Sequence, residues 1–317
     1  MATRFVLNLR ANVNASIRAF FQARSVLEVE TPILSQFANT DPNIASFHTS
    51  FDGSATIPTP QRWLRTSPEH ALKRLLAHDI GDCYELGRVF RNGEAGGRHN
   101  PEFTLLEWYR THWNARQLAE EVLDLLKELL LLVNVTPQIA HCTYRNVFIE
   151  TLNIDPLTAD LPDLQQACAH LCLSVNALEK DTCLDLLLTH CIQSTFQPHT
   201  LTVLSDWPAS QCALARINHS VHPPVSERFE VYLGQYELAN GYHELTDPVE
   251  QKERFEKDNH IRHLRHLGGM PIDTLFLDAL VHMPACAGVA LGVDRLLMAM
   301  CNTTAIADVL AFPFSAA

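Results

Sequence analysis

Two arginines lie in sequence contexts that suit the chemistry of an oligophosphate. A glycine-rich polar loop begins at Arg91, between an apolar run at 84–90 and a second run at 103–108, which predicts a β-hairpin with a long tip. The tip carries Arg91, His99 and Phe103 at fixed offsets. An arginine buried beside an oligophosphate stabilises the negative charge that develops on an attacked phosphorus and its oxygens. Arg91 and, near the C-terminus, Arg295 are therefore the candidates for that role.

Two carboxylates, Glu230 and Glu237, flank a predicted turn at Gly234-Gln235. If the loop has two residues, residue 232 pairs with Glu237, and Glu230 shares their face of the hairpin. The carboxylates are then diagonal neighbours, and hard oxygen ligands held together with phosphates are what Mg²⁺ requires. A three-residue loop would place Glu237 on the other face, so the spacing alone leaves this metal site open.

A larger group of acidic and polar residues predicts a binding pocket for a cation. Buried carboxylates require compensation, which a lysine-like diamine supplies and a neutral side chain does not. Within segment 237–244, Gly241 would permit a β-bulge that turns side chains of both parities toward one pocket. The pocket candidates are Glu69, Glu107, Tyr109, Asn240, Tyr242 and Glu244.

The elements that must position these residues follow an α+β pattern. Residues 8–24 have the helical period, and 27–34 is predicted to be a strand that Pro32 confines to an edge, bulge or interface position. Ser67 and Asn114 suit the N-caps of two further helices. Antiparallel hairpins separated by helices predict an α+β architecture and not a doubly wound sheet.

Composition narrows the class of protein. The chain has 317 residues, 47% of them hydrophobic, and a formal net charge of −12. This acidic balance disfavours a nucleic-acid-binding module, which usually carries a basic patch. The sequence has no apolar run long enough to span a membrane and no signal-peptide pattern, so we expect a cytosolic protein that does not bind membranes.

Three segments, in order along the chain, resemble the three motifs of class II aminoacyl-tRNA synthetases. Segment 20–34 is similar to motif 1, segment 90–107 to motif 2, and segment 288–295 (GVALGVDR) to motif 3. The resemblance is strongest to lysyl-tRNA synthetase, through TSPExxxKRL at 66–75, HNPEFTLLEWY at 99–109 and ELANGYHELTD at 237–247. It implies an antiparallel sheet flanked by helices, with ATP as co-substrate and Mg²⁺ as its ion.

The resemblance also implies roles for single residues. Arg91 would meet the α-phosphate, Arg295 the γ-phosphate and Phe103 the adenine, while Glu107 and Tyr109 would meet the side-chain amine of the amino acid. The other implied amino-acid contacts are Ser67, Glu69, Asn240, Tyr242 and Glu244. The implied ATP contacts are Arg91, Asn92, Gly93, Glu94, His99, Asn100, Phe103, Glu237, Leu238, Gly292 and Arg295.

Three features depart from a lysyl-tRNA synthetase. Nothing precedes the motif 1 helix, so we expect no anticodon-binding domain; Ala290 replaces a motif 3 glycine; and segment 77–91 is longer. All three resemble the truncated paralogue that activates (R)-β-lysine and joins it to a lysine of translation elongation factor P. We therefore expect one catalytic domain over 1–317 with a mainly helical insertion at about 135–200, a homodimer, and no tRNA substrate.

Two alternatives remain open from the sequence. The chain could charge tRNA or release free lysyl-adenylate, or it could be a non-catalytic amino-acid-binding regulator. Motif 2 normally reads Arg-x-Glu, whereas here Gly93 takes the third position and Glu94 follows it. Either Glu94 takes over the contact through a shifted loop, or that contact is lost.

Overall fold

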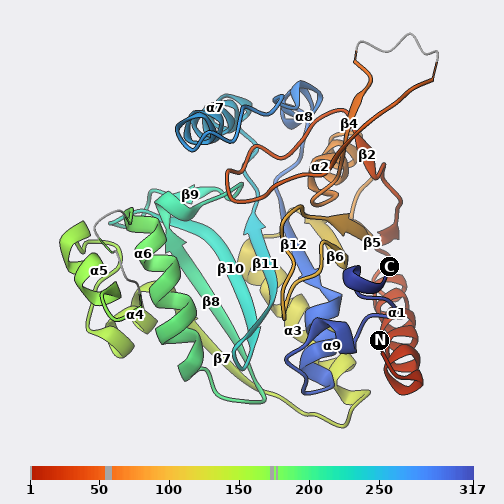
Figure 1. The fold of residues 1–317 in the computed structure, drawn as a ribbon, viewed down its shortest axis with the longest axis horizontal. Helices are drawn as coiled ribbons and strands as arrows, with labels where there is room; N and C mark the ends of the chain where they lie inside the picture. Colours follow the sequence, from red (N-terminus) through yellow and green to blue (C-terminus); the bar gives the residue numbers. More distant parts are fainter. Residues whose placement is uncertain (1, 54–58, 172–174, 176–177) are drawn as a thin grey trace. The chain divides into compact units, whose positions relative to one another are not determined.

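The computed structural model describes residues 2–53, 59–171, 175 and 178–317 (Figure 1). The chain forms two compact units, one from residues 1–112 and 245–317 and the other from 113–244. Within the described residues, no helix is long and apolar enough to cross a membrane.

The first unit combines a main sheet, a small three-stranded sheet and several helices. Its elements are α1 (Arg4–Gln22), β1 (Leu27–Glu28), β2 (Leu34–Ser35), β3 (His48–Ser50), β4 (Gln61–Leu64), α2 (Glu69–Ala77), β5 (Cys83–Phe90), β6 (Glu102–Thr111), α7 (Pro248–Leu264), α8 (Thr274–Leu280), β12 (Cys286–Gly292) and α9 (Val293–Met300).

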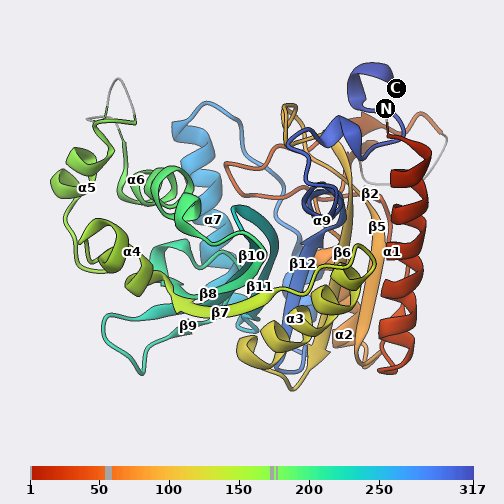
Figure 2. The same cartoon turned by 90° about the horizontal axis from the view of Figure 1, so that it is seen from below.

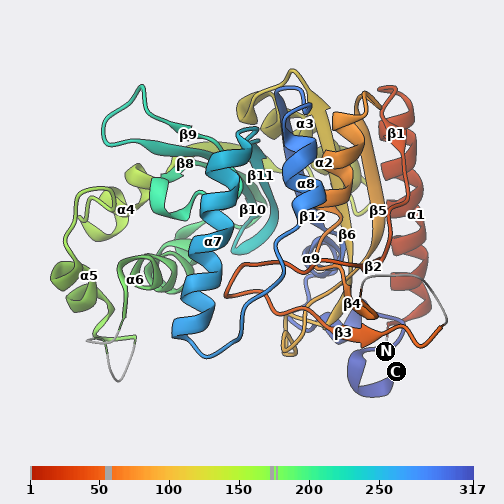
Figure 3. The ribbon, with the colours of Figure 1, turned by 90° about the horizontal axis from the view of Figure 1, so that it is seen from above.

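The hairpin β5–β6 is the centre of this unit. β5 pairs antiparallel with β6, β12 pairs antiparallel with the other edge of β6, and β1 runs parallel to β5. Helix α1 lies along β5 (Figure 2), where Phe21 stacks on Tyr84 with ring centroids 4.4 Å apart and meets Trp108 edge-on. Helices α2 and α8 lie side by side (Figure 3), and His70 of α2 stacks on Phe276 of α8 at 4.3 Å.

The predicted strand 27–34 is wrong as a single element. The chain has only the short β1 and β2 there, with residues 29–33 between them outside any strand. Proline has no N–H to donate to a ladder, so Pro32 breaks the pairing. The backbone N–H of Thr31, just before it, donates to the Glu85 carboxylate at 3.1 Å instead of to a neighbouring strand.

The second unit has its own strands and a cluster of helices. Its elements are α3 (Ala115–Leu131), β7 (Gln138–Thr143), α4 (Tyr144–Leu152), α5 (Leu161–Cys168), α6 (Lys180–Leu187), a π-helical turn (Leu188–Ile192), β8 (Thr200–Pro208), β9 (Ile217–Asn218), β10 (Val225–Leu233) and β11 (Tyr236–His243).

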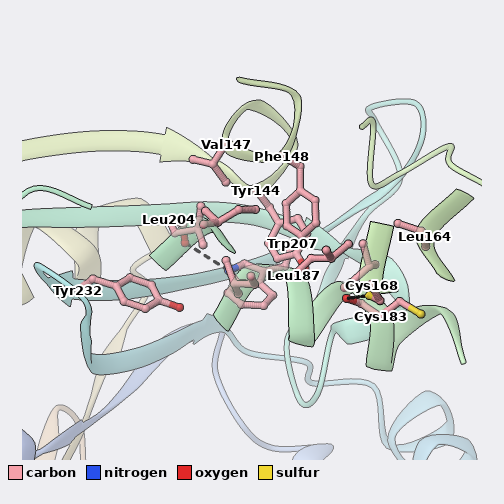
Figure 4. Packing of buried hydrophobic residues seen from close by; sticks show 13 residues of the cluster. Tyr144, Val147, Phe148, Leu164, Cys168, Cys183, Leu187, Leu204, Trp207 and Tyr232 are labelled. Carbon is pink, nitrogen blue, oxygen red and sulfur yellow. Dashed lines mark hydrogen bonds between the residues drawn. The ribbon is translucent and has the colours of Figure 1, made fainter. Parts of the chain in front are cut away.

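The strands β8, β10 and β11 pair antiparallel in the second unit, and β7 runs parallel to β8. Asn114 caps α3 in a reciprocal capping box with Gln117, as its sequence position predicts. Tyr144 and Trp207 form the centre of a buried apolar cluster under α4, α5 and α6 (Figure 4), where Trp207 donates to the Leu204 carbonyl at 3.3 Å.

The predicted α+β class with mainly antiparallel strands is confirmed in both units. Residues 135–200, predicted to be a mainly helical insertion, lie in the second unit and contain β7 as well as α4, α5 and α6. That they are an insertion into one catalytic domain stays a prediction.

Candidate active site

A buried carboxylate, Glu107 of β6, forms the centre of the candidate site in the first unit. It lies directly opposite Glu85 of β5 on one side and Ala290 of β12 on the other. Directly opposite residues of an antiparallel pair share a face, so these three side chains project from the same face. Glu107 is 2% exposed, and the hydroxyls of Ser67 and Tyr109 donate to its two oxygens at 2.6 and 2.9 Å.

The surroundings of Glu107 oppose its ionisation. Burial and then the charge of Glu69 raise its pKa from 4.5 to about 7, against the opposing effects of the Ser67 and Tyr109 hydrogen bonds and of Lys73. A desolvated carboxylate with a raised pKa is a group that a bound cation would stabilise. This is the electrostatic character that the sequence predicted for an amine-binding residue.

The start of α2 presents Ser67 and Glu69 to this carboxylate. The N-cap residue of α2 is Pro68, one position after the predicted Ser67. The Ser67 hydroxyl accepts from the Glu69 N–H at 2.9 Å while it donates to Glu107, so one side chain contacts both the start of the helix and the carboxylate. The Glu69 carboxylate in turn receives the ammonium of Lys73, one helical turn later, at 2.6 Å. The TSPE segment therefore positions two of the predicted substrate contacts.

The neighbouring carboxylate Glu85 is neutralised within the protein. Its oxygens contact the Arg65 guanidinium at 2.6 Å and the Thr31 hydroxyl at 2.6 Å. A side-chain carbon added at Gly87 would lie 2.6 Å from the Arg65 guanidinium, so a larger residue there would have to displace the cation that pairs with Glu85. Because Glu85 already has its cation, Glu107 is the carboxylate of this strand pair that is suited to an external cation.

The tip of the β5–β6 hairpin brings together the predicted adenine and phosphate contacts. The Arg91 guanidinium lies 5.1 Å from the centroid of the Phe103 ring and 3.8 Å from the Glu94 carboxylate. Gly93 has φ +83, a conformation that favours glycine, and the turn it makes lets Glu94 fold back to Arg91. The backbone N–H of Asn92 donates to the carbonyl of Ala45, in the segment before β3, at 2.8 Å. Whether Glu94 takes over the usual motif 2 contact stays open.

The phosphate end of the predicted site is organised around Arg295. Its guanidinium lies 3.0 Å from His99 Nε2, so the fold brings together two residues that are 196 positions apart and that the resemblance assigns to ATP. Gly292 is the N-cap of α9, which carries Arg295. The Asn100 amide is used structurally, since it donates to the Glu102 carbonyl at 2.6 Å and accepts from the Phe314 N–H at 2.9 Å.

In the second unit, the β10–β11 hairpin has the predicted two-residue loop. Tyr232 pairs with Glu237 and Leu233 with Tyr236, which leaves Gly234 and Gln235 as the turn. The sequence predicted a β-bulge at Gly241, and this position is wrong. The register between the two strands shifts directly after Glu237 instead.

Leu238 is the extra residue of that bulge, since Tyr232 pairs with Glu237 and Val231 with Ala239. One extra residue changes the parity of the strand, so Glu237 and Asn240 share the face of Glu230. The bulge at Leu238 therefore turns odd- and even-numbered side chains of β11 to one face, which is the effect predicted for a bulge at Gly241.

The two predicted magnesium ligands lie on this shared face. Burial and then the charge of Glu237 raise the pKa of Glu230 to about 7. Arg228 donates to one Glu230 oxygen at 2.5 Å, and Tyr232 donates to the other. A carboxylate has about four lone-pair sites, so Glu230 keeps the capacity to bind a metal ion beside these bonds.

Glu230 and Glu237 suit a magnesium ion that binds together with the phosphates of ATP. Among the described residues, no group of three or more His, Cys, Asp and Glu side chains is arranged to hold a metal. Mg²⁺ is commonly bound through one or two carboxylates with substrate phosphates and water completing its shell. Glu230 and Glu237 fit that pattern, because they are close enough for the charge of Glu237 to raise the pKa of Glu230. The magnesium site stays a prediction.

The predicted amino-acid contacts of the second unit lie on β11 and just after it. The Asn240 amide donates to the Tyr242 hydroxyl at 2.9 Å and accepts from Arg228 at 3.2 Å. Glu244 is 2% exposed and forms a bridge with Ala215. The pocket candidates of the sequence thus belong to both units, and their assembly into one pocket stays a prediction.

Three positioning residues were missed by sequence reasoning. Lys73 follows Glu69 by four residues, the spacing of neighbours on a helix face. Arg228 precedes Glu230 by two, the spacing of neighbours on a strand face, and its guanidinium lies 3.9 Å from the Trp207 ring. Asp294, next to the motif 3 arginine, pairs with Arg10 of α1 and accepts from the Thr104 N–H at 2.6 Å. Periodicity alone would have found the first two.

The fold and the motif residues define a class of protein. The chain belongs to the family of class II tRNA synthetases (D, K and N), whose model matches residues 2–316. It is also similar to a curated relative, the elongation factor P–(R)-β-lysine ligase of Yersinia enterocolitica serotype O:8 / biotype 1B. The two are 46% identical over 308 residues, which are 96% of this chain and 93% of the relative.

Proposed function

We propose that the chain is an ATP-dependent ligase that activates (R)-β-lysine and transfers it to the ε-amine of a lysine in elongation factor P. The observation that carries this proposal is the 46% identity to a ligase of that name across 96% of the chain. The buried Glu107, held by two hydroxyls and desolvated, supports a substrate that carries an ammonium group.

The reaction has two steps that conserve atoms. A carboxylate oxygen of the amino acid attacks the α-phosphorus of ATP, and the bond to pyrophosphate breaks as the aminoacyl-adenylate forms. The neutral ε-amine of the acceptor lysine then attacks the carbonyl carbon, the bond to AMP breaks, and the nitrogen loses a proton. No covalent enzyme intermediate is needed, so the work of the protein is positioning and charge stabilisation.

The residues of the first unit divide these tasks. We propose that Arg91 stabilises the α-phosphate charge, Arg295 binds the γ-phosphate, and Phe103 stacks on the adenine. The Arg91–Phe103 and Arg295–His99 contacts support this assignment, because each arginine lies beside another residue that the resemblance assigns to ATP. When the α-phosphate binds to Arg91, Arg91 would have to give up its contact with the Glu94 carboxylate.

The remaining assignments follow the same logic. Glu107 and Tyr109 would bind the side-chain amine, while Ser67 and Glu69 contact the rest of the amino acid. On β11, Asn240, Tyr242 and Glu244 would serve the amino acid as well. Glu230 and Glu237 would hold Mg²⁺, which supplies positive charge to the phosphates. We place the enzyme in the cytoplasm, as a homodimer that does not use tRNA.

Pyrophosphate exchange tests the activation step. The chain should exchange labelled pyrophosphate into ATP when (R)-β-lysine is present, with a reaction that omits the amino acid as the control. No exchange with either lysine isomer would favour the alternative of a non-catalytic regulator. Exchange followed by transfer to tRNA would favour the tRNA-charging alternative.

A further inference from the structure

Lys73 is a lysine with no exposed side-chain surface, next to the carboxylates of the candidate site. Its ammonium lies 2.6 Å from the carboxylate of Glu69, whose side chain is 20% exposed. The same ammonium lies 5.8 Å from the centroid of the Phe276 ring, on which His70 stacks. Burying an ammonium costs several kcal/mol, so a wholly buried lysine requires a partner and a reason to be there.

We propose that Lys73 is a positioning and charge-setting residue for the amino-acid substrate. Its ammonium is the built-in counter-ion of Glu69, so the group Glu69, Glu107 and Lys73 carries a net charge of −1 when Glu107 is ionised. One ammonium of the substrate matches that charge. This inference rests on the proposed function and names how the site limits the number of cations it accepts.

The charge count follows from the contacts. Two carboxylates and one ammonium sum to −1, and the neighbouring Glu85 is already paired with Arg65 at 2.6 Å. A diamine substrate therefore finds one ammonium matched at Glu107. Its second ammonium must be matched by other residues.

The elements packed around Glu107 define what else acts on its ionisation. Glu69 raises the pKa of Glu107 and Lys73 lowers it. On α8, Asp273 is paired with His70 at 3.2 Å. The other charged and titratable groups on α2, α8, β5, β6 and β12 are Glu69, His70, Lys73, Arg74, Asp278, Cys83, Tyr84, Glu85, Arg88, Glu102, Tyr109, Arg110 and Cys286, with Asp273 as the N-cap of α8.

Opposite pH shifts distinguish this role from a merely structural one. Lys73→Met removes a cation that lowers the pKa of Glu107, so the acid limb of kcat/KM for (R)-β-lysine should move to higher pH. Glu69→Gln removes a competing anion, so the same limb should move down. The double variant Glu69→Gln/Lys73→Met has the wild-type net charge of −1, and its acid limb should lie between those of the single variants.

The experiment measures amino-acid-dependent pyrophosphate exchange against pH for these variants, with the KM for ATP as a second readout. We expect ATP KM to change by less than about twofold, since the charge change is confined to the amino-acid side. Lys127→Met is the matched control, because Lys127 forms an exposed pair with Asp124 on α3. A Lys73→Met profile that superimposes on the wild-type profile would overturn the proposal.

Failure of the Lys73→Met variant to fold and failure of the proposed function can each be told apart from failure of this proposal. If Lys73→Met does not fold, the double variant compared with Glu69→Gln still decides, because an acid limb at equal pH in both overturns the proposal. If the wild-type chain shows no exchange with lysine or β-lysine, the proposed function fails. The pH dependence of thermal unfolding of the same variants then tests the charge coupling on its own.

Discussion

Glu107→Gln should make the protein more stable at alkaline pH while it weakens amino-acid activation. Glutamine has nearly the shape of the protonated glutamic acid but cannot ionise. In the folded chain the pKa of Glu107 is raised from 4.5 to about 7, chiefly by burial and next by Glu69. The folded state therefore holds a proton that the unfolded state has released, and stability is lost as the pH rises through this window.

The magnitude follows from the shift. Each pKa unit corresponds to about 1.4 kcal/mol, so a shift from 4.5 to about 7 corresponds to about 3 kcal/mol of lost stability. Below pH 4.5 the variant and the wild type should be equally stable with respect to this group. Their difference should grow between pH 4.5 and about 7 and level off above it.

Urea denaturation of both proteins over this pH range measures the difference in the free energy of unfolding. Glu102→Gln is the matched control, since Glu102 lies on the same strand but is half exposed and makes only a 3.6 Å surface pair with Arg88. Saturating (R)-β-lysine should stabilise the wild type more than Glu107→Gln at alkaline pH. A stability difference that does not vary with pH would refute the argument that Glu107 is a desolvated charge awaiting a cation.

Other substitutions test the remaining roles. Arg91→Ala should slow pyrophosphate exchange by roughly a hundredfold or more, comparable to losing an oxyanion-hole donor; a rate within a few-fold of wild type would remove Arg91 from the reaction. Ala290→Gly removes a methyl group that would block the α-amine of ordinary lysine. It should therefore raise activation of α-lysine relative to β-lysine by roughly ten- to two-hundredfold, the scale on which one methyl changes discrimination between substrates. An unchanged isomer ratio would place the preference elsewhere. Light scattering at micromolar concentration should show a homodimer. Leu27 and Leu34 are each 52% exposed on the short strands β1 and β2, and a second copy of the chain would bury them. A monomer would contradict this.

The hairpins were predictable because short-range geometry fixes them. Gly234-Gln235 allows a two-residue turn, and that turn sets the pairing of Tyr232 with Glu237. The bulge at Leu238 was not predictable, because its position depends on how β10 and β11 pack and not on the presence of a glycine. The pairing of Glu85 with Arg65 was likewise not predictable, because only the fold brings these two segments of the chain together.

The carboxylates show this limit most clearly. Sequence reasoning counted Glu69 as acidic and inferred a dicationic ligand, whereas Lys73 already neutralises one charge in the first unit. Glu85 is neutralised by Arg65, which follows the end of β4. The type of site followed from the motif residues, but the net charge of the site required the packing.

Transfer to the acceptor protein tests the central claim most directly. Elongation factor P should be incubated with the chain, ATP and (R)-β-lysine, and its intact mass and digested peptides measured. The account predicts one added β-lysyl group on a single lysine, dependent on both ATP and the amino acid and lost with Arg91→Ala. Unmodified elongation factor P, alongside charged tRNA or released adenylate, would contradict it.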